Sequence, residues 1–260
     1  MSGERGLDRR GFLGRGLAAA SATLLGGCDP MSEQPWVRRI LDSAETLTRV
    51  SQRALLSPSD LAREYSEAEI STDFKANGST DPDDTAYKAH AGSGFANWKL
   101  KVGGLVEEPL ALSLDELRAM PSRTQITRHD CVEGWSCIGK WKGVQLSALL
   151  ERARLKADAR YIVFYCADDL GGTGTEAGKY YESVGLADAF HVQTILAYEM
   201  NDRTLPIPHG APLRLRVERQ LGYKMAKYVM RVEAVGSLSP IRRGRGGFWE
   251  DLGYEWYAGI

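Results

Sequence analysis

The sequence predicts an α+β fold in which mixed β-sheets are surrounded by helices. Stretches in which apolar and polar residues alternate are typical of strands, and they recur along the body of the chain. Stretches with helical periodicity lie between them. The two kinds interleave without a strict strand–helix–strand rhythm, and this mixture favours α+β.

The chain before the body is predicted to be a polar, helical lead-in. Residues 31–66 contain two helix-like stretches, and the lead-in is assigned to residues 28–70. Residues 71–94 are rich in Gly, Asp, Ser and Thr, and they predict a long loop. Long loops without regular structure are often functional.

The first strand of the body is expected in residues 97–106. Apolar residues alternate there with lysines and share one face of the strand: Trp98, Leu100 and Val102. The segment "SLDELRAM" that follows predicts a helix, because Ser113 and Glu116 have the spacing of a capping box.

Two strands and one helix are expected in the middle of the chain. The segment "TQITRHDC", residues 124–131, predicts a strand. Residues 144–155 predict an amphipathic helix with one apolar face, formed by Leu146, Leu149, Leu150 and Ala153. Residues 159–167, "ARYIVFYCA", predict a buried strand that carries Cys166 at its far end.

Three further segments complete the body. Residues 171–184 are glycine-rich and lack the Gly-Lys-Ser/Thr ending of a phosphate-binding loop, so they predict a turn region. Residues 186–202 are helix-like. Residues 212–218, "PLRLRVE", predict a strand in which apolar and charged residues alternate.

The N-terminus has the layout of an export signal. Arg9 and Arg10 precede a Phe-Leu pair and a short apolar run, which is typical of a twin-arginine signal. The run is shorter than the roughly 20 apolar residues of a membrane-spanning helix. The sequence "LLGGC" resembles a lipobox, so we expect residues 1–27 to be removed and Cys28 to be lipidated in the periplasm. A chance arginine pair, or ordinary cleavage that leaves Cys28 free, is the alternative.

The composition argues against nucleic acid as a partner. The chain has 33 basic and 34 acidic residues and a formal net charge of −1. It contains no basic domain and no recognition motif for nucleic acid.

The segment "RHDCVEGWSC", residues 128–137, concentrates reactive side chains. A structural zinc site is not expected from Cys131 and Cys137, because their spacing lacks a second cysteine pair. A disulfide between them is credible in an oxidising compartment. Cys131 could also be a nucleophile with His209 as its base, whereas His129 is too close along the strand to serve.

Two blocks carry a resemblance to a known family. The segment "RHDCVEGWSCIGKWKGVQLSALL" resembles the cysteine segment of the sulfite oxidase family of molybdenum enzymes. It is most similar to the bacterial periplasmic branch that includes the methionine sulfoxide reductase catalytic subunit. A second block, "LAYEMNDRTLPIPHGAPLRLRVERQLGYKMAKYV", resembles a later part of that family. The resemblance covers about residues 70–236 and implies a sulfite oxidase-type molybdopterin-binding fold.

The resemblance implies roles for residues of these blocks. Cys131 matches the thiolate that binds molybdenum, and His209 would hydrogen-bond the pterin or its phosphate. Arg214 matches the arginine that binds the phosphate, for which its planar guanidinium is suited. A following loop would hold the other end of the cofactor, with Met225, Ala226 and Lys227.

Further candidates come from weaker matches. The early segment "TDFKANG" would line the pterin with Thr72, Lys75 and Ala76. Cys166 stands where the branch has a threonine near the site, and Glu133 could carry protons or pair with an arginine.

Each of these residues also has a structural explanation. Arg214 could be a solvated strand residue, Lys227 a surface charge and His209 an ordinary turn residue. Trp135 and Trp141 are expected to be packing residues.

The predicted function is an exported molybdenum-molybdopterin oxidoreductase. Its catalytic domain would span residues 71–240, and an aromatic tail, residues 241–260, would pack on it. The chemistry would be two-electron oxygen-atom transfer on a small-molecule oxo substrate, either sulfite oxidation or sulfoxide reduction. Basic residues for a sulfite pocket would be Arg128, Lys140 and Arg216.

No haem domain is expected in the chain, so electrons would pass through a separate partner, a cytochrome or a membrane haem protein. Two alternatives stay open at this point. One is a cofactor-free lipoprotein of the same fold that binds a partner, and the other is a thiol hydrolase that uses Cys131 and His209.

Overall fold

A computed structural model describes residues 34–37, 40, 43–44, 47, 50–51 and 60–260. The chain divides into two compact units, Met1–Ser51 and Gln52–Ile260. In the first unit, the described residues from 35 onward are helical. The predicted export signal and Cys28 lie outside the described residues.

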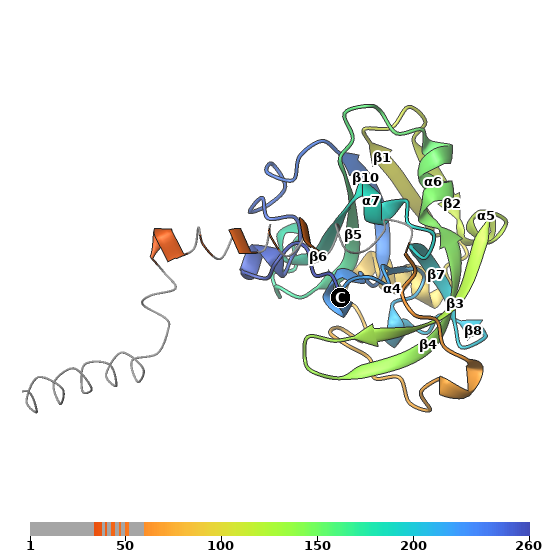
Figure 1. Cartoon of the computed structure of the whole chain (residues 1–260). Helices are drawn as coiled ribbons and strands as arrows, with labels where there is room; N and C mark the ends of the chain where they lie inside the picture. Colours follow the sequence, from red (N-terminus) through yellow and green to blue (C-terminus); the bar gives the residue numbers. More distant parts are fainter. Residues whose placement is uncertain (1–33, 38–39, 41–42, 45–46, 48–49, 52–59) are drawn as a thin grey trace, which may run out of the picture. The chain divides into compact units, whose positions relative to one another are not determined.

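The second unit is built on two β-sheets, each with five strands in the described part of the chain (Figure 1). The first sheet has the order β2-β1-β10-β5-β6. Its strands are β1 (Lys99–Gly104), β2 (Leu110–Ser113), β5 (Tyr161–Asp169), β6 (Lys179–Gly185) and β10 (Val229–Val235). Only β1 and β10 pair in parallel, so the sheet is mixed, as predicted.

The second sheet is antiparallel throughout. It has the order β3-β4-β7-β8, and a further strand, β9, pairs with β7. Its strands are β3 (Ser122–Asp130), β4 (Ser136–Gln145), β7 (Ile195–Met200), β8 (Arg203–Thr204) and β9 (Arg214–Arg216).

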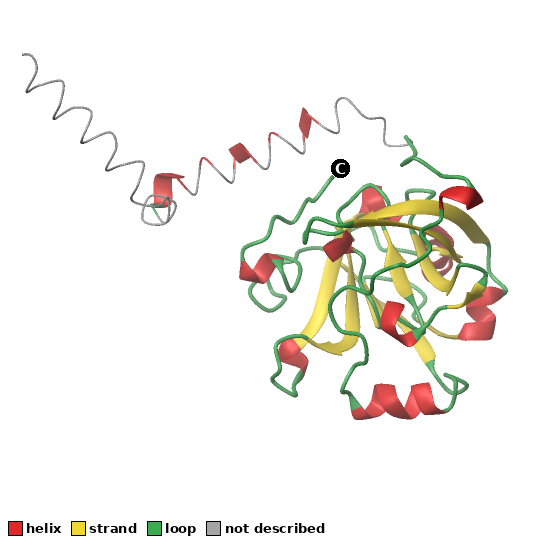
Figure 2. Ribbon diagram, turned by 90° about the horizontal axis from the view of Figure 1, so that it is seen from below, coloured by secondary structure: helices red, strands yellow, loops and turns green. Residues whose placement is uncertain are grey.

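Helices are short and lie around the strands (Figure 2). The α-helices of this unit are α4 (Thr85–Gly92), α5 (Leu114–Arg118), α6 (Leu146–Ala153) and α7 (Leu186–Ala189). Single turns of 3₁₀-helix are η1 (Glu67–Glu69), η2 (Glu176–Gly178), η3 (Ile207–His209), η4 (Gly222–Lys224) and η5 (Glu250–Leu252). The predicted capping box starts α5, with Ser113 Oγ 3.2 Å from Glu116 N and Ser113 N 2.8 Å from Glu116 Oε2.

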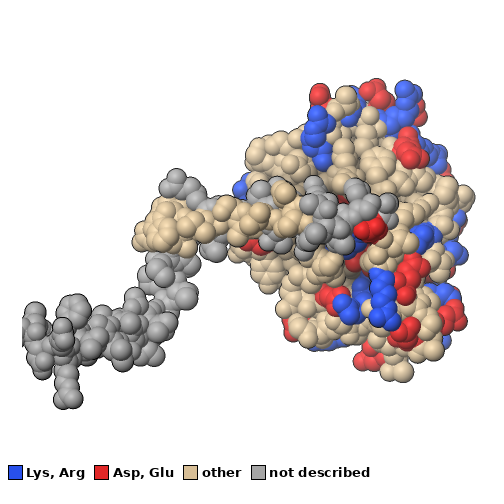
Figure 3. Space-filling model, viewed as in Figure 1, with Lys and Arg blue, Asp and Glu red and all other residues tan. Residues whose placement is uncertain are grey.

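Side chains of both charges are interspersed on the face shown in Figure 3. Among the described residues, no helix combines the length and the apolar character that crossing a membrane requires.

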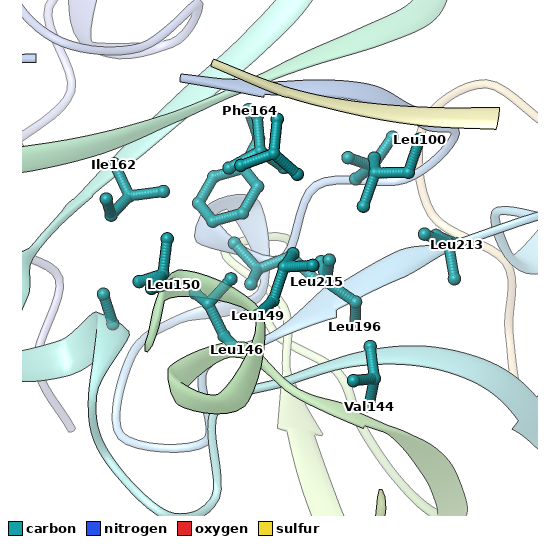
Figure 4. Close-up of a cluster of buried hydrophobic side chains, with 14 of the residues drawn as sticks. Leu100, Val144, Leu146, Leu149, Leu150, Ile162, Phe164, Leu196, Leu213 and Leu215 are labelled. Atoms are coloured by element: carbon teal, nitrogen blue, oxygen red, sulfur yellow. The ribbon is translucent and has the colours of Figure 1, made fainter. Parts of the chain in front are cut away.

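The core lies between the two sheets and against α6 (Figure 4). Leu100, Ile162 and Phe164 come from the first sheet, and Val144 and Leu215 from the second. The apolar face predicted for α6 is fully buried here, because its spacing places all four residues on one side of the helix: Leu146, Leu149, Leu150 and Ala153. The core fixes the strand ends and loops from which the site is made.

Several local predictions were wrong. Residues 60–66 are not helical, and Glu64 forms a bridge with Thr127 of β3. The expected loop at 71–94 contains α4. The turn region at 171–184 ends in β6, and the helix-like segment 186–202 is α7 followed by β7. Both strands are buried on nearly every residue, so they lack the alternation by which a strand is recognised.

Candidate functional site

A cavity of about 150 Å³ opens beside Cys131. Its walls come from residues 77–79, the turn after β3, the end of β5 with the start of β6, the η4 region and the C-terminal tail. The cavity brings together four of the residues predicted from sequence: Cys131, Glu133, Met225 and Lys227.

Cys131 lies in a tight turn that joins β3 to β4. Its backbone N donates to Trp135 O at 2.9 Å, and Gly134 N donates to Cys131 O at 3.0 Å. Gly134 has φ 84°, a left-handed conformation that glycine adopts without steric cost. The turn therefore fixes the thiol at the edge of the cavity.

The Cys131 thiol is free, and the same holds for Cys137 and Cys166 among the described cysteines. A disulfide between Cys131 and Cys137 is therefore not formed. Burial raises the pKa of the Cys131 thiol, and the Glu133 backbone N–H opposes this shift. The thiol is thus protonated at neutral pH, and a metal that bound it would release its proton.

Glu133 belongs to a small exposed cluster over the cavity mouth. Its Oε2 accepts a hydrogen bond from Trp135 Nε1 at 2.9 Å and lies 3.5 Å from Lys75 Nζ. Trp135 and Lys75 both lower the pKa of this carboxyl, and the indole hydrogen bond has the larger effect. Glu133 pairs with a lysine rather than with an arginine, and its role as a proton carrier stays a prediction.

Arg214 is fully buried, so the view that it is a solvated strand residue was wrong. Its Nη1 donates to His209 O at 3.2 Å, and its Nη2 donates to Asn77 Oδ1 at 3.1 Å. Its Nε has no partner among the described residues. Burial, and then the charge of Arg216, lower the pKa of Arg214 to about 9.

Lys227 is also buried and is not a surface charge. Its Nζ donates to the carbonyls of Asn77 at 2.7 Å and Pro208 at 2.8 Å, and to Ser79 O. Burial, followed by the charge of Arg214, lowers the pKa of Lys227 to about 7. Lys227 thereby links residues 77–79 to the loop at residues 225–227, which the sequence analysis assigned to the cofactor.

His209 lies at the end of η3, and its Nδ1 is buried without a partner in the described chain. Burial, and then Arg214, lower its pKa to about 4, so the ring is neutral at pH 7. In the described chain neither His209 nor His129 is hydrogen-bonded to Cys131, so the geometry of a thiol hydrolase is not present. The His129 Nδ1 instead lies 3.3 Å from Met225 Sδ.

Arg216 differs from Arg214 because it has an acidic partner. Its Nη2 lies 2.6 Å from Glu218 Oε2, and its Nε lies 2.8 Å from Glu218 Oε1. Both side chains are fully buried. Arg216 is therefore neutralised within the protein, whereas Arg214 and Lys227 have no ion-pair partner among the described residues.

This arrangement fits an anionic cofactor. Burying a cation without a counter-charge costs several kcal/mol, and a buried N–H without an acceptor adds a further cost. A phosphate near Arg214 and Lys227 would relieve both costs, because a guanidinium binds phosphate in a planar, two-point manner. Lys227 lines the cavity, whereas Arg214 and His209 do not. The free thiol of Cys131, which lines the cavity too, is the type of ligand that a soft metal prefers.

Other predicted residues do not line the cavity. Thr72 and Lys75 are exposed, and Ala76 is partly buried just before the loop at 77–79. Ala226 is buried, and its carbonyl accepts from Leu215 N at 2.8 Å. Their roles as cofactor contacts stay predictions.

Cys166 lies apart from the cavity beside Cys131. It is buried in β5, and burial raises the pKa of its thiol. A separate hollow, lined also by Trp98 and Met230, includes Cys166. Its predicted role toward the cofactor is untested.

Sequence reasoning missed several lining residues, of which Asp168 is the most informative. It is buried, its Oδ1 has no partner in the described chain, and burial raises its pKa to about 7. An acid inside the buried run of β5 was a signal that could have indicated it. Four other missed lining residues are aromatic: Tyr180, Tyr223, Trp249 and Tyr254.

The chain belongs to the family of oxidoreductases with a molybdopterin-binding domain. Residues 88–240 match the model of that family, described as "Oxidoreductase molybdopterin binding domain". The matched range contains the Cys131 turn, β9 and the loop that ends in Lys227. The chain is therefore a molybdopterin-binding oxidoreductase, and Mo-molybdopterin is its cofactor.

Among individual proteins, the chain is similar to relatives with sulfoxide reductase names. It is 38% identical over 251 residues to a protein of Azospira oryzae provisionally named protein-methionine-sulfoxide reductase subunit YedZ1, covering 96% of this chain and 87% of the relative. It is 32% identical to the protein-methionine-sulfoxide reductase catalytic subunit MsrP of Xanthomonas axonopodis pv. citri, covering 94% of this chain and 73% of the relative.

A solved structure is also similar, the sulfane dehydrogenase SoxCD from Paracoccus pantotrophus. The TM-score is 0.49 and the sequence identity 24%, over 54% of this chain and 39% of that chain.

The family match confirms the predictions of the α+β class, of the enzyme class and of the molybdopterin cofactor. The alternative of a cofactor-free lipoprotein loses its basis.

Proposed function

We propose that the protein reduces sulfoxides, and that Cys131 is the protein ligand of the molybdenum. The observation that carries the proposal is the set of charges around the cavity. Its ionisable lining includes two acids, Glu133 and Asp168, and one buried base, Lys227. With the cofactor's phosphate on Lys227 and Lys75 paired to Glu133, the described lining offers no free basic side chain to a dianion such as sulfite, whereas a neutral sulfoxide needs none.

The three basic residues considered for a sulfite pocket are engaged elsewhere. Arg128 Nε lies 2.9 Å from Asp130 Oδ1. Lys140 Nζ lies 2.7 Å from Glu67 Oε1 and bonds Asp202 as well. Arg216 is paired with Glu218, and none of the three lines the cavity. This distribution of charge supports reduction of a neutral sulfoxide over oxidation of sulfite.

The reaction consumes two electrons and two protons and converts a sulfoxide into a thioether and water. When bound, the molybdenum-pterin group supplies the two-electron oxygen-atom transfer. The chain would contribute binding and protons: Cys131 holds the metal, while Arg214, Lys227 and His209 hold the anionic end of the cofactor. Asp168, whose pKa near 7 keeps part of it protonated at neutral pH, is placed to supply a proton at its carboxyl oxygen.

Methionine sulfoxide in proteins is the substrate that we favour. The names of the two relatives describe reduction of protein methionine sulfoxide. The aromatic lining of the cavity suits this side chain, because thioether sulfur makes favourable contacts with aromatic rings.

The protein would act in the periplasm. The arginine pair at residues 9–10 supports export by the twin-arginine route, and "LLGGC" supports a lipid on Cys28. Electrons would come from a separate cytochrome or membrane haem protein. A Cys28→Ser variant tests the tether: it should be exported and released from the membrane fraction, whereas unchanged membrane association would contradict lipidation.

A substrate screen tests the main proposal. The full chain, purified after native export and analysed for molybdenum, is assayed with a reduced dye and methionine sulfoxide, and with an oxidised dye and sulfite. We expect turnover with methionine sulfoxide and at least 100-fold less turnover with sulfite. A factor of 100 corresponds to about 3 kcal/mol, roughly the free energy that binding an unpaired charge costs a site. Faster sulfite oxidation would overturn the direction that we propose.

The ligand assignment has its own test. Cys131→Ser should lose turnover and alter the optical spectrum of the metal centre, because a hydroxyl is a harder ligand than a thiolate. Cys137→Ser is the matched control, since Cys137 is also a free thiol but does not line the cavity. A Cys131→Ser variant with an unchanged spectrum and full turnover would refute the assignment.

A further inference from the structure

A second hollow adjoins the cavity beside Cys131. It is open and has a volume of about 730 Å³. One side is formed by residues 170–178, which run from the end of β5 through η2, and the other by residues 242–252 of the tail. Leu170 and Trp249 line both spaces, so the hollow and the cavity beside Cys131 share these two residues as a common wall. We call it the tail groove.

The tail side of the groove is held by buried charges. Glu250 Oε1 and Glu182 Oε1 each lie 2.5 Å from Lys224 Nζ, and all three side chains are essentially inaccessible. Tyr181 adds two links, since its carbonyl accepts from Phe248 N at 2.9 Å and its hydroxyl donates to Asp251 Oδ2 at 2.6 Å. The groove is therefore a preformed feature, which lowers the entropic cost of binding a ligand.

The groove carries positive charge that the described chain does not neutralise. The Arg242 guanidinium donates to backbone carbonyls, including Ala177 O at 3.2 Å, and lies 4.4 Å from the Tyr181 ring centre. Arg243 is exposed, and its Nη1 donates to Asp251 O, a carbonyl, at 3.3 Å. In the described residues neither guanidinium has a carboxylate within ion-pair distance. Asp251 also lines the groove, and its carboxylate accepts from the Tyr181 hydroxyl and from backbone N–H groups.

Apolar surface lies next to these charges. Leu252 is 56% exposed at the groove, and Phe248 and Trp249 form its inner wall. An exposed leucine beside an unpaired arginine, in a preformed hollow, suits a ligand with a carboxylate and an apolar stem.

We propose that the tail groove binds the polypeptide segment next to an oxidised methionine and prefers segments that carry an acidic side chain. This inference rests on the proposed function. The methionine sulfoxide side chain would enter the cavity beside Cys131, and the flanking residues would lie over Trp249 into the groove. The two spaces share the wall formed by Leu170 and Trp249, so a peptide that crosses this wall reaches both, and a volume of about 730 Å³ exceeds that of a single side chain.

The test compares three substrates on the molybdenum-loaded protein at low salt. They are free N-acetyl methionine sulfoxide and two short peptides that contain methionine sulfoxide followed by either glutamate or lysine residues. We expect kcat/KM to be about two- to fivefold higher for the glutamate peptide than for the lysine peptide, the effect of one exposed ion pair.

Arg243→Glu should reverse the preference between the two peptides, since the sign of the local charge is inverted. Arg152→Glu is the matched control, because it makes the same change of net charge on α6, outside the groove. The control should keep the wild-type ratio. An Arg243→Glu ratio equal to that of Arg152→Glu would overturn the proposal.

A binding measurement separates this inference from the proposed function. Fluorescence anisotropy of labelled, unoxidised forms of the two peptides reports binding without turnover, and here also the preference should reverse in Arg243→Glu. If no sulfoxide is reduced but this reversal is seen, peptide binding by the groove is supported and the proposed reaction is refuted. If methionine sulfoxide is reduced while both peptides bind all variants equally, the reaction stands and the groove proposal fails.

Discussion

The buried lysine beside the cavity predicts a pH dependence for the cofactor-free protein. The pKa of Lys227 is lowered to about 7 by burial and by Arg214, from an ordinary value of 10.5. Between these two values the unfolded chain binds more protons than the folded chain. Stability therefore rises with pH over this range, at up to about 1.4 kcal/mol per pH unit for one proton.

Lys227 dominates the window from pH 7.5 to 8.5. Asp168, with a folded pKa near 7, is already mostly ionised there, His209, with one near 4, is neutral, and Arg214, with one near 9, begins to lose its proton only at the top of the window. The thiols of Cys131 and Cys166 oppose the rise, because burial raises their pKa values, but they start to contribute only near their ordinary value of 9.0. We therefore expect a net gain of about 1 kcal/mol across this window.

Urea unfolding of protein made in a host without molybdopterin measures the gain. In Lys227→Met the titrating group is removed, so the rise should disappear. Lys142→Met is the control, since that lysine is half-exposed on β4 and pairs with Glu199. A Lys227→Met variant that keeps the full rise would refute the reasoning. Protein that carries the anionic cofactor should also lose the rise, because the nearby negative charge restores the lysine's pKa.

Three more outcomes are expected. In a plot of kcat against pH, the unmodified protein should lose activity as pH rises through about 7. Asp168→Asn should lack this decrease, since an amide supplies no proton. Lys224→Met should lower the free energy of unfolding by about 3–5 kcal/mol, because two buried carboxylates lose their cation, and Glu250→Gln should cost clearly less in the same urea titration. Leu150→Ala should cost about 2–5 kcal/mol by calorimetry, whereas the exposed Leu252→Ala should cost little.

The fold was predictable where one face of an element meets solvent. The helix α6 and the strand β1 each have a polar and an apolar side, so their periods are visible in the sequence. The strands β6 and β7 are buried on nearly all sides, and a continuous apolar run does not distinguish strand from helix. Tertiary packing determined that those segments form strands.

The site was predictable where chemistry is concentrated. Cys131 and Lys227 were found through blocks of characteristic residues, and the structure places both on one cavity. Asp168 and Trp249 were missed because a lining position depends on how distant segments meet. A single acid in a strand, or a tryptophan in an aromatic tail, has the same local pattern whether or not it faces a cavity.

The place of β10 in its sheet has a consequence for how the protein assembles. This late strand lies between β1 and β5 and is parallel to β1, which is far away in the sequence. The two early hairpins, β1–β2 and β5–β6, are joined only when β10 enters between them. Such long-range closure slows folding. The Lys227 loop leads directly into β10, so the cofactor pocket and the first sheet should form together, and hydrogen exchange should protect both in one step.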